Sequence, residues 1–527
     1  MEEYSRLKDR FSKFANSAFR QCQQEAISAA VKCRKKYCVS ELPTGGGKSL
    51  IGMTTGAATG DTTYLVHSKA LQVQLGGDFA EAPILWGRGN YQCIREGVNE
   101  GTMADACSNT KKNRCDEKED CPYVIAKRIG KESRIRILNY DYFITEANNV
   151  GVFSRVQSAN KNDIVIVDEA DALESLLSGY INIEISERLI NRYNISRPRF
   201  KTKEAKDGVS SWKAWGYEMI ERMAKLLKLL AADIEAFPIN LSNAQKAILR
   251  SHEQVGGLLK KLKMFVECVD ETWLYDEDNK GIRFRPTWIT GPMANSVLWE
   301  HGDKFLLMSA TFHKPHILAK LLGIGLKDIE FHTYPSTFPE SSRRVVIRPV
   351  AEMVYDKMAE EIPKAINEVK NILATHKNEK GLVHCVSYAL RDAIMEIGDP
   401  RLMTHGPGDK LDVIDIFKAS RHPMVLVSPS SDRGISLDDD LCRFIVWVKA
   451  PYLNLKDKLV NARLYSSGRL GQEWYTSSML LSVVQGCGRG TRSKDDWCVS
   501  YLLDRKITDA IGKYPNLVPG WFLDACW

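Results

Sequence analysis

The chain has no hydrophobic run long enough to cross a membrane. A spanning helix needs about 18 consecutive apolar residues, and no such stretch occurs among the 527 residues. The first residues, MEEYSRLKDRF, mix acidic and basic side chains without the apolar segment that marks a secretory leader. We therefore predict a protein that neither spans a membrane nor is secreted, and that resides in the reducing cytoplasm.

The composition has no strong bias either. With 19 prolines, 36 glycines and 44% hydrophobic residues, the chain is neither of low complexity nor disordered. The net charge is only +7, a slight preference for polyanionic partners that identifies no function. The length exceeds what one hydrophobic core supports, which predicts about three or four domains.

A disulfide framework is not expected. Thirteen cysteines is an odd number, and in a reducing compartment they are predicted to be free thiols. Four of them fall within 29 residues: Cys93, Cys107, Cys115 and Cys121. They lack the C-x-x-C pairs typical of structural zinc, but four soft ligands suit either zinc or an iron–sulfur cluster. Unliganded thiols are the third possibility.

Short apolar strands alternate with helical segments in both halves of the chain. The strand-like segments are YCVSEL, TTYLVH and DIVIVDEAD in the first half and GLVHCV, PMVLVS, RFIVWV and CVSYLLD in the second. Unbroken apolar runs are typical of parallel strands that are covered on both faces. The sequence therefore predicts an α/β fold with two parallel-sheet lobes.

The segment between these halves has helical periodicity. Apolar side chains recur at steps of three and four residues at Trp212, Trp215, Met219, Met223, Leu226, Leu230 and Ile234. A second helical run follows the turn FPINLSN, so we predict a helical hairpin inserted in the first lobe, with this stripe in its core. The acidic stretch DETWLYDEDNKG after it is predicted to be a solvated loop.

The stretch SELPTGGGKSL places three glycines between a strand and a helix start. Backbone N–H groups of such a turn can surround phosphate oxygens; here they belong to Thr44, Gly45, Gly46 and Gly47. Lys48 is placed to reach the β- and γ-phosphates of ATP, and the Ser49 hydroxyl to bind the bridging Mg²⁺. Leu42 replaces the first glycine of the strict P-loop pattern, so an ordinary glycine-rich turn is the alternative.

Two carboxylates directly follow the buried strand IVIV. An aspartate at this position, Asp168, is where a second Mg²⁺-holding group is needed, and Glu169 is placed to polarise a water molecule. The alternative, a solvated acidic pair, is typical of surface loops rather than of the end of a buried strand.

These motifs resemble those of superfamily 2 helicases, which have two RecA-like lobes. Residues 43–49 match the form P-T-G-x-G-K-[ST], and residues 168–171 match D-E-A-[DH]. MSATF, residues 308–312, resembles their S-A-T motif, and QGCGRGTR, residues 485–492, resembles Q-x-x-G-R-x-x-R. The resemblance implies that the second lobe contributes Gln485, Arg489 and Arg492 to the nucleotide site, with both arginines reaching the γ-phosphate.

Two weaker motifs extend the resemblance. FRQCQQEAI, before the P-loop, is similar to the adenine-recognising element, which implies that Gln23 reads the base with Arg20 beside it. SDRGISL, residues 431–437, resembles the motif that lies between nucleic acid and nucleotide, with Asp432 and Gly434 at its centre.

The cysteine quartet narrows the resemblance to the XPD and DinG type of iron–sulfur helicase. In that group four cysteines at this place hold a [4Fe–4S] cluster, which implies that role for the quartet, and the helical hairpin corresponds to the arch. Two departures are Asp171, where that group has His, and Ser49, where it commonly has Thr. The implied domains are lobe 1 at 1–90, 131–180 and 286–325, the iron–sulfur domain at 91–130, the arch at 181–285 and lobe 2 at 326–527.

The resemblance implies an ATP-dependent DNA helicase that moves along single-stranded DNA from 5′ to 3′ and opens forked duplexes. We expect a monomer that is associated with the nucleoid if the host is bacterial or viral. Basic residues around the quartet fit either a wedge at the duplex junction or a solvated face: Lys111, Lys112, Arg114, Lys127, Arg128 and Arg134. Rival interpretations are a nucleic-acid-stimulated translocase, an RNA helicase with a zinc-binding cysteine module, and a scaffold that binds no nucleotide.

Overall fold

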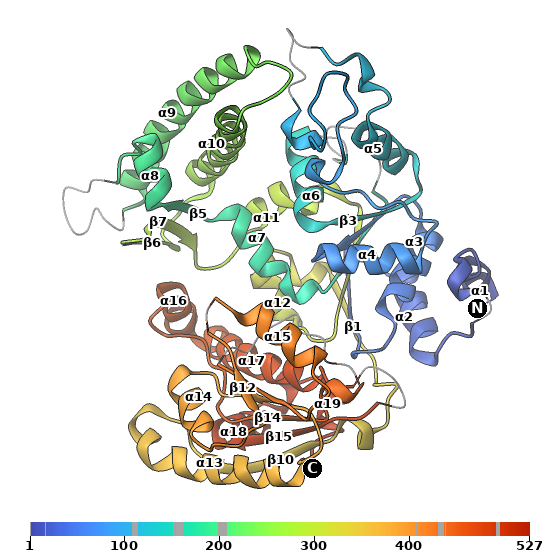
Figure 1. Cartoon of the computed structure of the whole chain (residues 1–527), viewed down its shortest axis with the longest axis vertical. Helices are drawn as coiled ribbons and strands as arrows, with labels where there is room; N and C mark the ends of the chain where they lie inside the picture. The colour runs from blue at the N-terminus through green and yellow to red at the C-terminus, as the bar shows by residue number, and fades with distance from the viewer. Residues whose placement is uncertain are drawn as a thin grey trace.

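The computed structural model describes residues 2–15, 17–107, 114–150, 153, 162–198, 208–406, 408–429, 437, 439–491 and 496–527. Two α/β lobes lie one above the other, and a helical hairpin and the cysteine-containing segment project from the upper lobe (Figure 1). The prediction of two parallel-sheet lobes with a helical insertion is confirmed. No helix in these ranges combines the length and the apolar character that a membrane span requires.

The upper lobe, lobe 1, is built on a six-stranded parallel sheet in the order β3-β2-β4-β8-β1-β9. Its strands are β1 (Tyr37–Glu41), β2 (Thr62–Val66), β3 (Ile135–Asn139), β4 (Ile164–Asp168), β8 (Lys304–Ser309) and β9 (Ile329–Thr333). Alternate side chains of β4 enter different cores, because Ile164 and Ile166 face one side of the sheet and Val165 and Val167 the other. Both faces are therefore buried, as the unbroken apolar runs predict.

The helices of lobe 1 connect these strands. They are α1 (Glu2–Lys8), α2 (Gln21–Lys32), α3 (Lys48–Thr59), α4 (Lys69–Asp78), α5 (Pro122–Glu132), α6 (Tyr140–Thr145), α7 (Leu173–Ile181), α11 (Gly291–Val297) and α12 (Pro315–Leu322). The cysteine-containing segment leaves the sheet after α4 and returns through α5 to β3.

The predicted start of lobe 2 at residue 326 is too early. Strand β9 pairs in parallel with β1, with Tyr37 opposite Ile329 and Glu41 opposite Thr333, so lobe 1 continues to residue 333. The sequence analysis missed this strand because IEFHT lacks the unbroken apolar run of its neighbours. It lies at the edge of the sheet, where burial is only partial.

Lobe 2 has its own six-stranded parallel sheet, in the order β10-β15-β14-β11-β13-β12. Its strands are β10 (Val345–Ala351), β11 (Gly381–His384), β12 (Leu402–Thr404), β13 (Val425–Ser428), β14 (Phe444–Trp447) and β15 (Val499–Asp504). The covering helices are α13 (Met358–Thr375), α14 (Tyr388–Met395), α15 (Lys410–Ala419), α16 (Lys458–Ser466), α17 (Gly468–Cys487), α18 (Arg505–Lys513) and α19 (Gly520–Leu523).

The arch is the helical hairpin of α9 (Val209–Glu235) and α10 (Asn243–Cys268), preceded by α8 (Glu187–Tyr193). As predicted, its Trp and Met stripe forms a core: Trp212 and Met219 are each 1% exposed. A three-stranded antiparallel sheet forms the root of the arch and consists of β5 (Ile183–Ser186), β6 (Trp273–Asp278) and β7 (Gly281–Pro286).

The prediction of a solvated loop after the arch is wrong. The stretch DETWLYDEDNKG forms most of β6 and its turn, and Trp273 is buried. Trp273 and Tyr275 stand two positions apart on the strand, so both side chains face the same side and enter the arch core. This spacing of the two aromatic residues was the signal that the high acidic content obscured.

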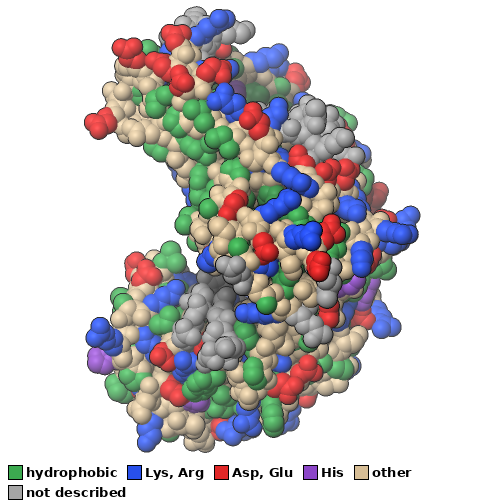
Figure 2. Space-filling view, turned by 90° about the vertical axis from the view of Figure 1, so that its right-hand side faces the viewer, with side chains coloured by type: hydrophobic (Ala, Val, Ile, Leu, Met, Phe, Trp, Pro, Cys, Tyr) green, Lys and Arg blue, Asp and Glu red, His purple; other side chains and the backbone are tan. Residues whose placement is uncertain are grey.

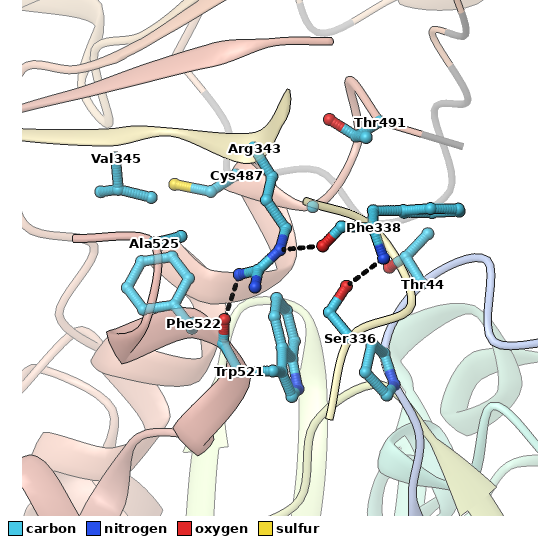
Figure 3. Close-up of a pocket in the computed structure, with 12 residues that line it drawn as sticks. Thr44, Ser336, Phe338, Arg343, Val345, Cys487, Thr491, Trp521, Phe522 and Ala525 are labelled. Atoms are coloured by element: carbon cyan, nitrogen blue, oxygen red, sulfur yellow. Dashed lines mark hydrogen bonds between the residues drawn. The ribbon is translucent and has the colours of Figure 1, made fainter. Parts of the chain in front are cut away.

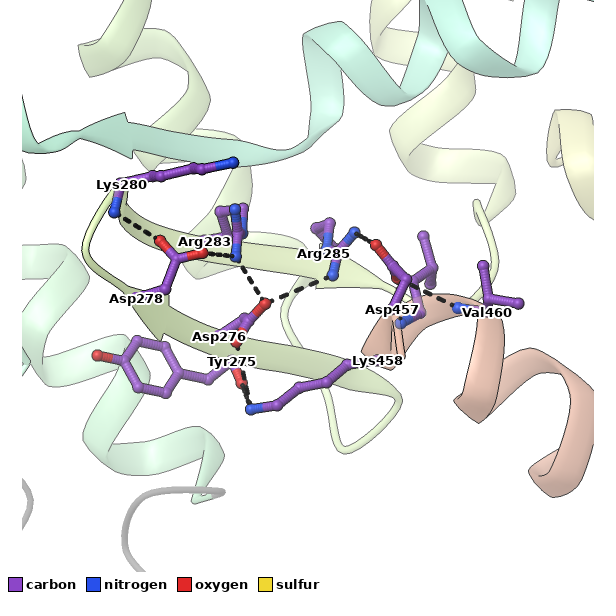
Figure 4. Close-up of polar contacts among 10 residues, drawn as sticks. Tyr275, Asp276, Asp278, Lys280, Arg283, Arg285, Asp457, Lys458 and Val460 are labelled. Carbon is purple, nitrogen blue, oxygen red and sulfur yellow. Dashed lines mark hydrogen bonds and ion pairs between the residues drawn. The ribbon is translucent and has the colours of Figure 1, made fainter. Parts of the chain in front are cut away.

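The arch root also contacts lobe 2. Arg285 of β7 pairs with Asp457 at 3.1 Å, and Lys458 of α16 pairs with Asp276 of β6 at 3.4 Å (Figure 4). We call these four residues, together with Trp288, the arch-root joint; the Trp288 indole donates to Ser467 between α16 and α17 at 2.9 Å. On one side of the molecule, a deep notch separates the upper and lower halves (Figure 2).

Candidate nucleotide site and lobe interface

The glycine-rich turn lies between β1 and α3 and has the backbone of a phosphate-binding loop. Gly45 and Gly47 adopt φ values of 75° and 77°, which residues with a side chain rarely adopt. A Cβ atom on Gly47 would lie only 2.1 Å from Nε2 of Gln23. Helix α3 begins directly at Lys48, so its unpaired N–H groups and its positive end face the turn.

Arg20 and Gln23 brace this turn from α2. The Arg20 guanidinium donates to the carbonyl of Gly45 at 2.6 Å, and the Gln23 amide donates to the carbonyl of Gly46 at 3.2 Å. Gln23 is 5% exposed, and its side-chain oxygen accepts the backbone N–H of Arg20 at 3.0 Å. Both side chains are thus engaged with the loop backbone, and their role toward adenine stays a prediction.

Asp168, the last residue of β4, has both carboxylate oxygens fixed. Oδ1 accepts the N–H of Glu169 at 3.0 Å, and Oδ2 accepts the Tyr64 hydroxyl at 3.0 Å. The Tyr140 hydroxyl donates to the backbone carbonyl of Asp168. Burial raises the pKa of Asp168 to about 6, although the nearby Lys48 ammonium opposes the shift.

Lys48 and Glu169 form an ion pair of 3.5 Å across the turn. Burial alone would lower the pKa of Lys48, but the carboxylates of Glu169, Asp168 and Asp171 raise it, so the ammonium keeps its charge. Glu169 has a φ of 53°, a left-handed conformation that is costly for a residue with a side chain and often occurs at functional sites. Its side chain is 44% exposed, so water can reach it.

The oxygen ligands predicted for Mg²⁺ come together. Ser49 opens α3 next to Lys48, and its side chain lies near the hydroxyl of Tyr64, the same residue that contacts the Asp168 carboxylate. Hydroxyl and carboxylate oxygens are the ligands that Mg²⁺ prefers. The donor set around Tyr64 therefore fits a magnesium ion that also binds phosphate.

A polar network links this site to lobe 2. The Gln485 amide of α17 donates to Asp171 at 2.7 Å and to the Thr311 hydroxyl at 2.8 Å. Ser309, at the end of β8, donates to the other carboxylate oxygen of Asp171 at 2.7 Å. The D-E-A-D segment, the S-A-T segment and the glutamine of lobe 2 thus meet around one carboxylate. A cavity of about 370 Å³ beside this network separates α7 and α12 from α17.

Lobe 2 also approaches the P-loop directly. A Cβ atom on Gly488, just after α17, would lie 3.3 Å from the Thr44 hydroxyl. The cavity between the loop and lobe 2 has a volume of about 20 Å³, enough for one water molecule. It is lined by Pro43 and Thr44 on one side and by Phe338, Arg343 and Trp521 on the other (Figure 3).

The arginine motif is described only in part. Arg489 follows Gly488 and is 8% exposed, so it lies buried at the lobe interface on the P-loop side. Arg492, Asp432 and Gly434 lie outside the described residues. The predicted approach of these arginines to a γ-phosphate stays a prediction.

The four clustered cysteines lie in one excursion between α4 and β3, and each is partly exposed. The Cys115 thiol donates to Glu117 at 3.6 Å, and the Cys93 N–H donates to the Thr102 carbonyl at 2.8 Å. Within the described ranges, no three His, Cys, Asp or Glu side chains gather closely enough to hold a metal ion. The donor chemistry fits a thiolate-bound cluster, whereas the described arrangement does not form the site.

The basic residues around the quartet are not uniformly available to a ligand. Lys127 pairs with Glu146 at 2.5 Å and is 18% exposed, and Arg134 donates to the carbonyl of Ala57 at 3.2 Å. Lys111 and Lys112 lie outside the described residues. On the face in Figure 2, basic and acidic side chains are interspersed rather than segregated.

Sequence reasoning missed three side chains at this site: Tyr64, Tyr140 and Glu41. Each is a polar residue that is 2% exposed or less. The available signal was a tyrosine or glutamate within an apolar strand or at its end, because a buried polar group there must find a partner nearby. That signal indicates burial and a partner but does not identify the partner.

The geometry defines a class of protein: a two-lobed P-loop fold in which a glycine-rich loop, an acidic strand end and a glutamine from the second lobe meet. Family comparison gives the same result. Residues 85–190 match the family described as DEAD_2, and residues 365–524 match the Helicase C-terminal domain. These two matches support the resemblance of the chain to the XPD and DinG type of superfamily 2 helicases.

Curated relatives are distant. The ATP-dependent DNA helicase CHL1 of Saccharomyces cerevisiae (strain YJM789) is 21% identical over 73% of this chain and 54% of its own length. The protein of the same name from Candida glabrata is 21% identical over 74% and 56%. The chain therefore spans about half the length of the curated relatives it matches.

Solved structures show the same fold. A structure titled XPD_Helicase has a TM-score of 0.62 at 16% identity, covering 97% of this chain and all of the other. The structure of S. tokodaii Xpd4 has a TM-score of 0.57 at 13% identity, covering 94% of this chain and 98% of the other. At such identities the likeness concerns the arrangement of lobes and insertions.

Proposed function

We propose that this chain is an ATP-dependent DNA helicase that translocates on single-stranded DNA and separates forked duplexes. The observation that carries the proposal is that Lys48, Asp168 and Glu169 gather at the P-loop, while Gln485 of the other lobe donates to Asp171 of the same D-E-A-D segment. A nucleotide bound at such a site would contact residues of both lobes, so its binding can change the position of one lobe relative to the other. The names of the CHL1 relatives support DNA as the substrate.

Each side chain then has a defined task. The P-loop N–H groups and Lys48 bind the phosphates, and Glu169, which is partly exposed, orients the attacking water. Asp168 and Ser49 would hold Mg²⁺, which supplies charge neutralisation at the β- and γ-phosphates when bound. Arg489 and Arg492 are proposed to stabilise the charge that develops on the transferred phosphoryl group.

Nucleotide entry is expected to move lobe 2 at the P-loop. The gap of about 20 Å³ between Thr44 and lobe 2 is far too small for a nucleotide, so binding there must separate Thr44 from Gly488. A nucleotide with different affinity for the separated and the closed arrangement would convert hydrolysis into lobe motion. Contacts to DNA phosphates predict binding that tolerates sequence and weakens with salt. By family resemblance we infer movement from 5′ to 3′.

The test is Lys48→Ala in DNA-stimulated ATP hydrolysis and fork unwinding. We expect kcat to fall about a hundredfold or more, because the phosphates lose their buried cation. Lys35→Ala is the matched control, since Lys35 is exposed on the same lobe. Forks with a free 5′ tail, a free 3′ tail and RNA strands test polarity and substrate.

The outcomes separate the rival interpretations. Hydrolysis that survives Lys48→Ala would refute the nucleotide site. Hydrolysis by the wild-type protein without displacement of any strand would indicate a translocase, and displacement of RNA duplexes alone would indicate an RNA helicase. Absence of ATP hydrolysis by the wild-type protein would indicate a scaffold that binds nucleic acid but no nucleotide.

We further propose that Cys93, Cys107, Cys115 and Cys121 hold a [4Fe–4S] cluster. Four partly exposed thiols in one excursion are a suitable ligand set, and the position within the DEAD_2 match supports it. Because the described thiols do not gather into a site, metal loading is expected to rearrange the segment.

Metal analysis of anaerobically purified protein tests this assignment. About four iron and four labile sulfide per chain are expected, and Cys115→Ser should lower both. Cys268→Ser is the control, because Cys268 is partly exposed but lies in the arch. One zinc per chain without sulfide would show that the four cysteines hold zinc and not a cluster. A protein without bound metal would refute both the cluster and the zinc assignment.

A further inference from the structure

Tyr64 occupies a slot that directs its hydroxyl to the nucleotide site. It lies at the centre of β2, opposite Ile166 of β4, and is fully buried. The ring packs against α3 at Gly52, where a Cβ atom would lie 2.7 Å from Cε2 of the ring and 2.8 Å from Met308. Only glycine leaves room for the ring at that helix position, so strand and helix together fix its orientation.

The hydroxyl contacts one of the two residues predicted to bind Mg²⁺ and lies near the other. It donates to Oδ2 of Asp168 at 3.0 Å, and the Ser49 side chain lies close to it. A tyrosine hydroxyl has one proton to donate and lone pairs to accept, so a serine hydroxyl beside it can also donate to it while the carboxylate accepts its proton. With the Glu169 N–H on Oδ1, this contact sets the plane of the Asp168 carboxylate.

We propose that Tyr64 is a positioning residue that fixes the Asp168 carboxylate, beside Ser49, in the arrangement required to bind the magnesium ion of a magnesium–nucleotide complex. The inference rests on the proposed nucleotide site and adds to it a residue that neither contacts phosphate nor belongs to a helicase motif identified in the sequence.

The physical basis is the cost of leaving buried oxygens unpaired. Without the hydroxyl, Oδ2 of Asp168 loses its donor, so the carboxylate can turn away from the metal position. Hydrogen bonds to a buried carboxylate are stronger than those between neutral groups. Removal of the hydroxyl should therefore weaken Mg²⁺ binding more than it weakens the direct contacts of the P-loop with phosphate.

The experiment compares Tyr64→Phe with the wild-type protein in the binding of a fluorescent, non-hydrolysable ATP analogue, titrated with MgCl₂ and repeated in EDTA. Phenylalanine keeps the ring in its slot and removes only the hydroxyl. We expect the half-saturating Mg²⁺ concentration to rise about tenfold, while affinity in EDTA changes less than twofold. Tyr142→Phe is the matched control, because Tyr142 is also buried and its hydroxyl lies 3.5 Å from that of Tyr123.

A second variant tests the slot itself. Gly52→Ala should push the ring aside with its hydroxyl still present and should also raise the Mg²⁺ requirement. The thermal unfolding midpoint of each variant shows whether it folds. If Tyr64→Phe does not fold, the Mg²⁺ requirement of Gly52→Ala decides whether Tyr64 has the positioning role.

Equal losses with and without Mg²⁺ in a folded variant would overturn the positioning role, and so would a shift no larger than that of Tyr142→Phe. These results leave the proposed function intact, because the wild-type protein still binds the analogue. A wild-type protein that binds no analogue in either buffer would overturn both the proposed function and this inference.

Discussion

Glu41 is a buried carboxyl directly before the P-loop. It is the last residue of β1 and is 2% exposed. Oε1 accepts the N–H of Phe312 at 3.1 Å, next to the S-A-T segment, whereas Oε2 has no hydrogen-bond partner in the described part of the chain. Burial raises the pKa of Glu41 to about 7, although the Phe312 N–H and Lys314 oppose the shift.

The raised pKa predicts a pH-dependent loss of stability. Between about pH 4.5 and 7 the folded state binds a proton at Glu41 that the unfolded state has released, so the free energy of unfolding falls as the pH rises. The loss is about 3 kcal/mol and is complete above pH 7. Glu41→Gln should not show it, because an amide carries no charge to bury.

Urea unfolding of both proteins between pH 4.5 and 8 measures this difference. The stability of Glu41→Gln relative to the wild-type protein should increase with pH over this range. Glu271→Gln, at an exposed position of the arch root, should follow the wild-type curve. Parallel curves for Glu41→Gln and the wild-type protein would show that Glu41 ionises at its ordinary pKa.

Helix α17 spans the contact between the lobes. Near its N-terminus, Arg463 of the preceding α16 is enclosed between the rings of Trp288 and Trp474, at 4.9 Å and 5.1 Å. The guanidinium also pairs with Glu174 of α7 at 2.8 Å and donates to the Thr287 carbonyl at 2.6 Å. Near its C-terminus, α17 carries Gln485 to Asp171. One arginine thus links α16 and α17 of lobe 2 to α7 and the strand end of the arch root.

Arg463→Ala should weaken the contact between the lobes. The change leaves Glu174 without this partner and removes the cation between two rings, which should cost about 2 kcal/mol. Arg463→Lys keeps the charge but not the planar fork, so an intermediate loss is expected. Thermal unfolding followed by tryptophan fluorescence is a suitable measurement, because Trp288 and Trp474 lie at the contact.

Arg469→Ala provides the comparison for this prediction. Arg469 pairs with Glu473 on the same helix but is 90% exposed, so its loss should shift the unfolding midpoint much less than the loss of Arg463. Equal shifts for the two variants would mean that the enclosed arginine contributes no more than a surface pair.

For the molecule as a whole, the sequence was sufficient to predict those strands whose unbroken apolar pattern indicates that both faces of the sheet are buried. IVIVD, FIVW and VLVS became central strands of two parallel sheets, and the arch followed from the three- and four-residue spacing of Trp212 to Met223. The loop glycines could also be predicted, because the left-handed turn at Gly45 and Gly47 requires that residue type.

The features that the sequence did not predict depend on contacts between segments that are far apart in the chain. The edge strand β9 is defined by its pairing with β1 and not by its own composition. Tyr64 and Asp168 are 104 positions apart, and Arg463 and Glu174 are 289 apart. No local pattern specifies which buried tyrosine or arginine meets which carboxylate, because that depends on strand order and on how the lobes dock.

The length of α17 gives the lobe contact a mechanical property. Its 20 residues measure about 30 Å from the arch-root joint to the P-loop. Tilting this rod by about 10° around its Gly488 end would sweep the Gly468 end through about 5 Å, by the same geometry. A small rotation of α17 where Gly488 meets Thr44 therefore becomes a large displacement at the root of the arch, so α17 has the proportions of a lever.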